Sequence, residues 1–348
     1  MAAAVVPRSD VVVRAPRPGE GTAIARLWKE LWDIHTEWGG YPGTQDLSVY
    51  DGLARRLDDD AITRNGEPIQ GHHLHVVAVA GTEVIGQVEG WMDRHGFQSS
   101  TPYTCEVRSL IVSARARASG AGRALLDELA RTARYAAGGP VVMAAEVLEP
   151  NPAHTFYARV GYHPIGWTAR IETHVDPASI DARTGGRIRG RAAGAFDALP
   201  IALLDGVLAT RRRSQRDLRF DGPRPIEATL TGAIATHLAA TRREPSEFVA
   251  VDRENNVQAT ASLAVMALDP PFLPNRRALL GRISVDPAVS PMASMAALVR
   301  IGVEVARGRG ARGLEITDLS GPGTPMHDAA LLAGARPWSR IVARNIDI

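Results

Sequence analysis

The sequence predicts an α/β (α+β) protein of two similar domains, each a mixed, mostly antiparallel sheet flanked by helices. The chain has 348 residues, which is too long for one ordinary hydrophobic core. Runs rich in β-branched residues alternate with amphipathic runs whose apolar residues recur at helical spacing. The order of the runs repeats, because Val112 and Val285 each end a strand, Gly161 and Gly334 each end a short helix, and both pairs lie 173 residues apart. We therefore expect an internal duplication.

The first domain is expected over residues 1–175. A short first strand is followed by a helix in which Ile24, Leu27 and Leu31 recur on one face. Two β-rich runs on either side of Gly81 indicate a hairpin. The expected elements, in order, are a strand at 10–16, helices at about 18–34 and 47–62, strands at 74–80, 82–94 and 104–112, a helix at 120–137, a strand at 140–148, a helix at 151–162 and a strand at 163–175.

The second domain is expected over residues 196–348, after a linker at 176–195 that is rich in Gly, Arg and Ala. It repeats the plan of the first. The expected elements are helices at 199–215 and 226–241, strands at 247–252, 257–268 and 278–287, a helix at 292–310, a strand at 312–319 and a helix at 324–337.

Composition and charge exclude several classes of protein. The formal net charge is +2, and the run Arg211–Arg213 is too short for a nucleic-acid surface, so we expect it on an exposed helix. The chain has neither an apolar run of about 18 residues nor a signal peptide, so no membrane partner is expected. The single cysteine, Cys105, cannot form an internal disulfide and fits a cytoplasmic location. His72, His73 and His75 lack an obvious carboxylate partner, so we expect no metal.

Gly120 and Gly122 mark the point where a strand passes into a helix. A helix N-terminus exposes N–H groups and the positive end of the helix dipole. If the preceding turn is small and bare, an anion such as pyrophosphate can reach those groups. Arg115, Arg117 and Arg123 add positive charge nearby. The pattern predicts an anion-binding loop, although an ordinary glycine-containing turn has the same local sequence.

The pattern Val112-x4-Arg117-x2-Gly120-x-Gly122 resembles the acetyl-CoA pyrophosphate loop of the GNAT N-acetyltransferase superfamily. About 30 residues later, "NPAHTFYARVGY" is similar to the next motif of that family. The two motifs stand in the family's order, and the resemblance extends over about residues 10–173. It implies a GNAT fold, with acetyl-CoA as the acyl donor.

The resemblance also implies roles for individual residues. Main-chain groups of the strand end would pair with the pantetheine arm as if it were an added strand, and the loop N–H groups would hold the pyrophosphate. Asn151 would bond the pantetheine or the acetyl side, and Tyr157 would protonate the departing sulfur. The residues expected at the coenzyme are Leu110, Ile111, Val112, Arg117, Ala118, Ser119, Gly120, Ala121, Gly122, Arg123, Asn151 and Phe156.

The attacking amine must lose a proton, and the resemblance implies Glu106 as the general base, because a glutamate serves at the matching position in several family members. The alternative is a surface carboxylate paired with Arg108, which shares its strand face. Glu89 and Glu146 are weaker candidates for the base.

Family members shape the acceptor site with the first two helices and the loop between them. Carboxylates and aromatic residues are mixed here, which suits a cationic, polyhydroxylated or aromatic amine, although a solvated helix face explains the same charges. The expected acceptor residues are Trp32, Glu37, Trp38 and Tyr41, and Asp33, Asp46, Asp51 and Asp58–Asp60 lie in the same region.

The shift of 173 residues makes the second half an internal control. Gly122 maps to Met295, Glu106 to Leu279 and Tyr157 to Ala330, so the chemical positions are lost while the strand and helix patterns persist. We expect a degenerate domain that binds acetyl-CoA poorly and packs against the first half as a pseudo-dimer or walls the acceptor pocket. The arrangement resembles tandem GNAT proteins such as mycothiol synthases, whose active half is the other one.

The sequence therefore predicts an acetyl-CoA-dependent N-acetyltransferase acting on a primary amine of a small molecule, such as an aminoglycoside-like or polyamine acceptor. The alternatives are transfer of a longer acyl group from its CoA ester, and a non-catalytic acyl-CoA-binding regulatory module. We expect a monomer with pseudo-dimeric halves or a homodimer.

Overall fold

The computed structural model describes residues 11–94, 103–184, 187–215, 217, 246–268, 270–273 and 275–347. The helix expected at 226–241 lies outside these residues. Within them, the expected order of strands and helices is found in both halves.

The strands are β1 (Val11–Arg14), β2 (Ile69–Gln70), β3 (His73–Ala80), β4 (Glu83–Arg94), β5 (Tyr103–Val112), β6 (Val141–Leu148), β7 (His163–Glu172), β8 (Arg189–Ala192), β9 (Glu247–Val251), β10 (Val257–Ala267), β11 (Arg276–Val285), β12 (Gly313–Leu319) and β13 (Arg336–Ile346). The α-helices are α1 (Gly21–Glu37), α2 (Leu47–Arg64), α3 (Ala121–Ala137), α4 (Ala153–Arg159), α5 (Pro177–Thr184), α6 (Ala198–Ser214), α8 (Pro291–Gly308) and α9 (Pro325–Leu332). Two short 3₁₀ turns are η2 (Ala114–Ala116) and η3 (Ala195–Asp197).

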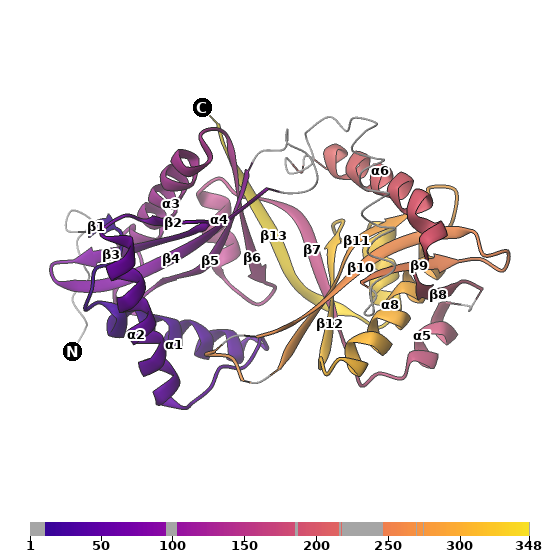
Figure 1. Ribbon diagram of the computed structural model, residues 1–348, viewed down its shortest axis with the longest axis horizontal. Coiled ribbons are helices and arrows are strands. Elements are labelled where there is room, and N and C mark those ends of the chain that lie inside the picture. Colours follow the sequence, from indigo (N-terminus) through magenta and orange to yellow (C-terminus); the bar gives the residue numbers. More distant parts are fainter. Residues whose placement is uncertain are drawn as a thin grey trace.

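The two halves exchange their last strands. The sheet runs β1-β3-β4-β5-β6-β13-β7-β12-β11-β10-β9-β8, so β13 of the second half lies between β6 and β7 of the first, and β7 lies between β13 and β12 (Figure 1). Both β13 pairings and the β7–β12 pairing are antiparallel. Separating the halves would leave the edges of β6 and β7 without partners, so the shared ladder joins the halves into one sheet.

The duplication is visible in the backbone. β5 and β11 have the same length and start 173 residues apart, as do β7 and β13. Near the end of β5, Ser109 has φ 54°, and its counterpart Arg282 in β11 has φ 51°. A positive φ is uncommon for residues other than glycine, so the same local distortion at both positions supports a common origin for the two halves.

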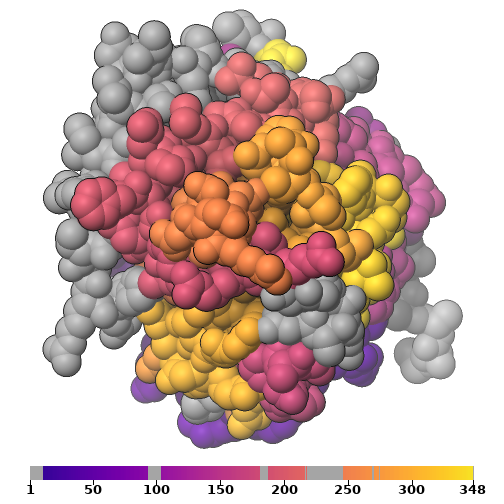
Figure 2. All heavy atoms as spheres, turned by 90° about the vertical axis from the view of Figure 1, so that its right-hand side faces the viewer, coloured from indigo at the N-terminus to yellow at the C-terminus, as the bar shows by residue number. Residues whose placement is uncertain are grey.

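Helices cover both faces of the first-half sheet. α3 packs on one face, where Leu125, Leu126 and Leu129 are buried against strands β3 to β6. α1 and α2 pack on the other face, where Ile24 and Leu57 belong to a separate buried cluster. In the second half α8 and α6 lie on opposite sides of the strands, as both the ribbon and the end-on view show (Figures 1 and 2).

The interval 176–195, expected to link the domains, contains α5 and β8. β8 pairs with β9 and approaches α8 so closely that a Cβ atom on Gly190 would lie 2.4 Å from the carbonyl oxygen of Ala297. This interval is therefore packed onto the second half. None of the helices in the described ranges is long and apolar enough to cross a membrane.

Candidate active site

The distorted end of β5 creates an open main-chain edge. β6 pairs with β5 only from Tyr103 to Val107. Beyond that point Ser109 has its positive φ, and the register with β4 shifts. Within the described residues, the segment from Arg108 to Val112 therefore has no strand partner on the β6 side. The edge that the sequence analysis assigns to pantetheine is present, with Ile111 buried and Leu110 and Val112 half-buried.

Buried polar side chains hold this distortion. Gln87 Nε2 donates to the carbonyl oxygen of Ser109 at 3.2 Å, and His75 Nε2 lies 2.9 Å from Gln87 Oε1. Glu89 is also buried and bonds with Ser109. Although burial raises the pKa of Glu89, His73, His75 and Ser109 together keep it below its ordinary value.

His73 connects this network to α2. Arg64 Nη2 lies 2.7 Å from His73 Nδ1, and a guanidinium can only donate. His73 Nδ1 is therefore the acceptor, and its Nε2, 3.4 Å from Glu89 Oε1, carries the proton toward the carboxylate. The sequence analysis noted the histidines only as a metal candidate and missed that they position the bulge, because their partners come from three separate elements.

The loop before α3 has the backbone that the glycine pattern predicts. Ala118 has φ 71° and Gly120 φ 89°, so the chain turns sharply at both. Ser119 is buried, and its Oγ accepts from Ala121 N at 3.3 Å. The N–H groups of the first helical turn have no intrahelical acceptor, so Gly122 and Arg123 present theirs at the start of α3.

Gly122 packs against the second motif. A Cβ atom there would lie 3.3 Å from Phe156 Cζ and 3.6 Å from Val112 Cγ2. The strand end, the loop and α4 therefore meet at this glycine. Arg117 extends over the strand end, with Nε 3.4 Å from the carbonyl oxygen of Val112 and Nη2 3.2 Å from Glu30.

Asn151 and Tyr157 belong to α4 and its start. Asn151 Oδ1 accepts from Ala153 N at 2.8 Å, which stabilises the first turn of the helix. Tyr157 is 7% exposed and packs edge-on against Phe156 and Tyr162. Burial raises the pKa of Tyr157, so its phenol stays protonated at neutral pH.

Glu106 lies on the α1–α2 face of the sheet. Arg108 Nη2 donates to its carboxylate at 2.7 Å, and the Arg108 guanidinium also lies 5.8 Å from the Trp91 ring. The pairing with Arg108 that we considered as an alternative is therefore present. Because the two side chains are 47% and 53% exposed, the pair is held only weakly, and Glu106 remains accessible.

The expected acceptor residues surround the loop between α1 and α2. Trp32 packs on Phe272 with ring centroids 4.4 Å apart, and Tyr41 donates to Glu315, so both contact the second half. Trp38 lies beside His35, and Glu37 is exposed at the end of α1. The structure therefore brings Trp32 and Tyr41 together with second-half residues that the sequence analysis did not name.

Several carboxylates of this region have local structural partners. Asp33 pairs with Lys29 at 2.6 Å, Asp46 accepts from Ser48 N at the start of α2, and Asp58 accepts from the N–H groups of Gly19 and Gly21. These acids stabilise helix ends and a turn, so the acidic composition of α1 and α2 is not by itself a sign of a cationic ligand.

In the second half, arginines of α6 occupy the equivalent edge. Ile283 is the counterpart of Leu110, and its carbonyl oxygen accepts from Arg211 Nη2 at 2.9 Å. Arg212 is fully buried, donates to the carbonyl oxygen of Ile165 at 3.0 Å and also bonds Asp318. Burial lowers the pKa of Arg211 to about 10. The expectation that this arginine run decorates an exposed helix is wrong for Arg212, because its acceptors come from distant strands.

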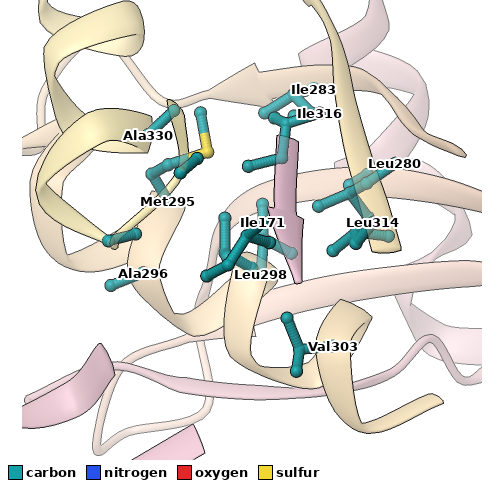
Figure 3. Close-up of a cluster of buried hydrophobic side chains, with 14 of the residues drawn as sticks. Ile171, Leu280, Ile283, Met295, Ala296, Leu298, Val303, Leu314, Ile316 and Ala330 are labelled. Carbon is teal, nitrogen blue, oxygen red and sulfur yellow. The ribbon is translucent and has the colours of Figure 1, made fainter. Parts of the chain in front are cut away.

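The counterpart of the anion loop is filled with apolar side chains. Met295 is fully buried, and Figure 3 shows it in the second-half core beside Ala330, the counterpart of Tyr157. Ile171 of the exchanged strand β7 lies in the same cluster (Figure 3). Among the described residues, no group of three His, Cys, Asp or Glu side chains is arranged to hold a metal ion.

Comparisons with known proteins agree with this geometry. The model of the Acetyltransferase (GNAT) family matches residues 28–162. No curated protein matches the chain in sequence.

Several solved structures share the fold over nearly the whole chain. A GCN5-related N-acetyltransferase from Sphaerobacter thermophilus is 17% identical, with 99% of both chains covered and a TM-score of 0.56. A glucosamine N-acetyltransferase region of a fungal multi-domain GH3 beta-N-acetylglucosaminidase is 13% identical, with 96% of this chain and 38% of that chain covered and a TM-score of 0.56. A tandem GNAT protein from the clavulanic acid biosynthesis pathway is 17% identical, with 97% and 98% covered and a TM-score of 0.48.

Proposed function

Because residues 28–162 of this chain form a GNAT acetyltransferase domain, we propose that the protein transfers an acetyl group from acetyl-CoA to a primary amine of a small molecule. The observation that carries the proposal is the open edge at Leu110–Val112, which leads directly into the loop and N-terminus of α3. An extended pantetheine arm can pair with such an edge, and the pyrophosphate that follows it needs the N–H groups at the helix start.

Glu106 and Tyr157 divide the proton chemistry of this proposal. The neutral amine attacks the thioester carbonyl carbon, and the carbon–sulfur bond breaks as the amide bond forms. Glu106 accepts the proton that the amine loses, directly or through water. Tyr157 donates its phenolic proton to the sulfur, and its raised pKa means that the proton is present when the sulfur departs.

The first domain, residues 1–175, holds the proposed chemistry, and residues 196–348 form a degenerate domain with residues 176–195 between them. Arg211 at the carbonyl of Ile283 and Met295 in the place of Gly122 support a second half that binds no acetyl-CoA. The shared sheet supports a monomer with pseudo-dimeric halves. Cys105 is a buried free thiol, which is compatible with the proposed cytoplasmic location.

Release of free thiol from acetyl-CoA, measured against a panel of amines, tests the proposal. We expect amine-dependent thiol release and a product that is heavier by one acetyl group. Tight binding of acetyl-CoA without turnover on any amine would instead support a non-catalytic binding module. Faster turnover with a longer acyl-CoA than with acetyl-CoA would support the alternative donor.

A further inference from the structure

A hairpin of the second half reaches over the proposed acceptor region. The turn between β10 and β11 meets the loop between α1 and α2, where Gly43 forms a bridge with Phe272 (Figure 1). Thr44 N donates to the carbonyl oxygen of Pro271 at 2.8 Å, and Leu273 N donates to that of Pro42 at 3.0 Å. The acceptor region is therefore lined by both halves.

The strand register places several charged side chains on the face that carries Glu106. Glu106 is paired with Ala144 of β6, and side chains two residues apart in a strand share a face, so Glu146 faces the same side as Glu106. Arg277 Nη2, at the start of β11, lies 2.8 Å from Glu146 Oε2 and 2.6 Å from Glu315 Oε2. Three strands separate β6 from β11 in the sheet, so the hairpin must cross over this face for Arg277 and Glu146 to meet.

These groups form a row of alternating charge, which we define as Arg108, Glu106, Glu146 and Arg277. Glu146 and Arg277 keep 31% and 25% of their side chains exposed, so a small molecule can reach all four members. Burial raises the pKa of Glu146, but Arg277, Ser339 and Arg108 hold it below its ordinary value. Glu146 is thus ionised and lies within the influence of both guanidiniums.

Aromatic residues from both halves surround the inner end of the row. The Tyr41 ring packs edge-on against Phe272 and Trp338, and the Arg170 guanidinium lies 5.0 Å from the Tyr41 ring. Tyr41 also donates to Glu315, whose side chain is fully buried. The floor of this region is therefore fixed, and Arg277 is held in place by a buried carboxylate.

We propose that the acceptor is a zwitterion, a small molecule that carries an acid group beside its primary amine, with the amine at Glu106 and the acid group at Arg108 and Arg277. The inference rests on the proposed acetyl transfer, because it names the substrate class of that reaction. A zwitterion leaves each of its charges beside an opposite charge of the row, whereas a polyamine or an aminoglycoside would bring further ammonium groups against two guanidiniums.

A panel of acceptors of matched size tests this proposal. Amino acids with α- and ω-amino groups are compared with their carboxamides, with polyamines and with an aminoglycoside. We expect kcat/KM for the free acids to exceed that for the carboxamides by about tenfold or more, because the carboxamide loses a charge-assisted hydrogen bond.

Arg108→Gln is the matching variant, since Arg108 is half exposed and its removal leaves no buried charge unpaired. We expect it to reduce the preference for free acids by about tenfold, mainly through KM for the acceptor, with KM for acetyl-CoA unchanged. Arg131→Gln is the control, because Arg131 is exposed on α3 and pairs with Glu128; the preference should be unaltered. Arg277→Lys, which keeps the charge near Glu315, should reduce the preference partially.

The outcomes separate this inference from the proposed function. Equal or better turnover with carboxamides or polyamines, with the preference insensitive to Arg108→Gln, would overturn the zwitterion while leaving acetyl transfer intact. If no amine is acetylated, the proposed function fails, and calorimetric binding of the same panel decides the inference. Tighter binding of the free acids would then support it, and equal binding of acids and carboxamides would refute it.

Discussion

Replacing Gly122 with methionine, the residue at the matching position of the second half, tests the anion loop. A Cβ atom at Gly122 would lie 3.3 Å from Phe156 Cζ, so the ring has to move by only a few tenths of an ångström. Removing a glycine from a helix stabilises the fold by about 0.5–1 kcal/mol, which offsets this crowding. We therefore expect Gly122→Met to fold, with a melting temperature within a few degrees of the parent.

Acetyl-CoA binding, in contrast, should be lost. The added side chain occupies the space in front of the N–H groups at the start of α3, where a pyrophosphate would sit. Hydrogen bonds to a charged group contribute about 1.5–3 kcal/mol each. Losing two of them at the lower value costs about 3 kcal/mol, which corresponds to more than a hundredfold increase in Kd.

Isothermal titration calorimetry with acetyl-CoA measures this change. Gly206→Met is the matched control, since Gly206 lies in α6 with no atom within 4 Å of its Cβ position, and its Kd should equal that of the parent. An unchanged Kd for a folded Gly122→Met protein would refute the assignment of the pyrophosphate to this loop.

Three further predictions follow from individual side chains. Tyr157→Phe should lower kcat about a hundredfold with little change in Kd for acetyl-CoA; equal losses in both would contradict its role as acid. Arg212→Met should lower the free energy of unfolding by about 2–4 kcal/mol in urea, because its buried hydrogen bonds to Ile165 and Asp318 are lost; an unchanged midpoint would contradict this. Burial, with Asp205 adding and Arg282 opposing, raises the pKa of Glu247 from 4.5 to about 7. Since the unfolded chain ionises first, this group's stabilisation is complete below pH 4.5 and is lost as the pH rises through about 7, by about 3 kcal/mol in total; Glu247→Gln should remove that dependence, and an identical pH profile for the variant would refute it.

Local features of the site could be predicted from the sequence because they depend on short-range geometry. The loop at Gly120 and Gly122 needs residues that tolerate a tight turn, and the helix that follows has its own periodicity. The duplication could also be predicted, since equal spacing of Val112 and Val285, and of Gly161 and Gly334, requires no knowledge of contacts.

Long-range features could not be predicted in the same way. The exchange of β7 and β13 depends on pairing between distant segments, and each strand has the same local pattern whichever partner it finds. Arg212 was misjudged for this reason, because three adjacent arginines look like a solvated helix face until the carbonyl groups of Ile165 and Asp318 are known to lie beside them. Arg277 was missed because nothing in its own segment indicates that it reaches Glu146.

The most direct test of the account is a crystal structure of the protein with coenzyme A. We expect one coenzyme per chain, with its pantetheine along Leu110–Val112 and its pyrophosphate at the start of α3. A coenzyme bound along β11 at the start of α8, with the first-half edge unoccupied, would contradict it.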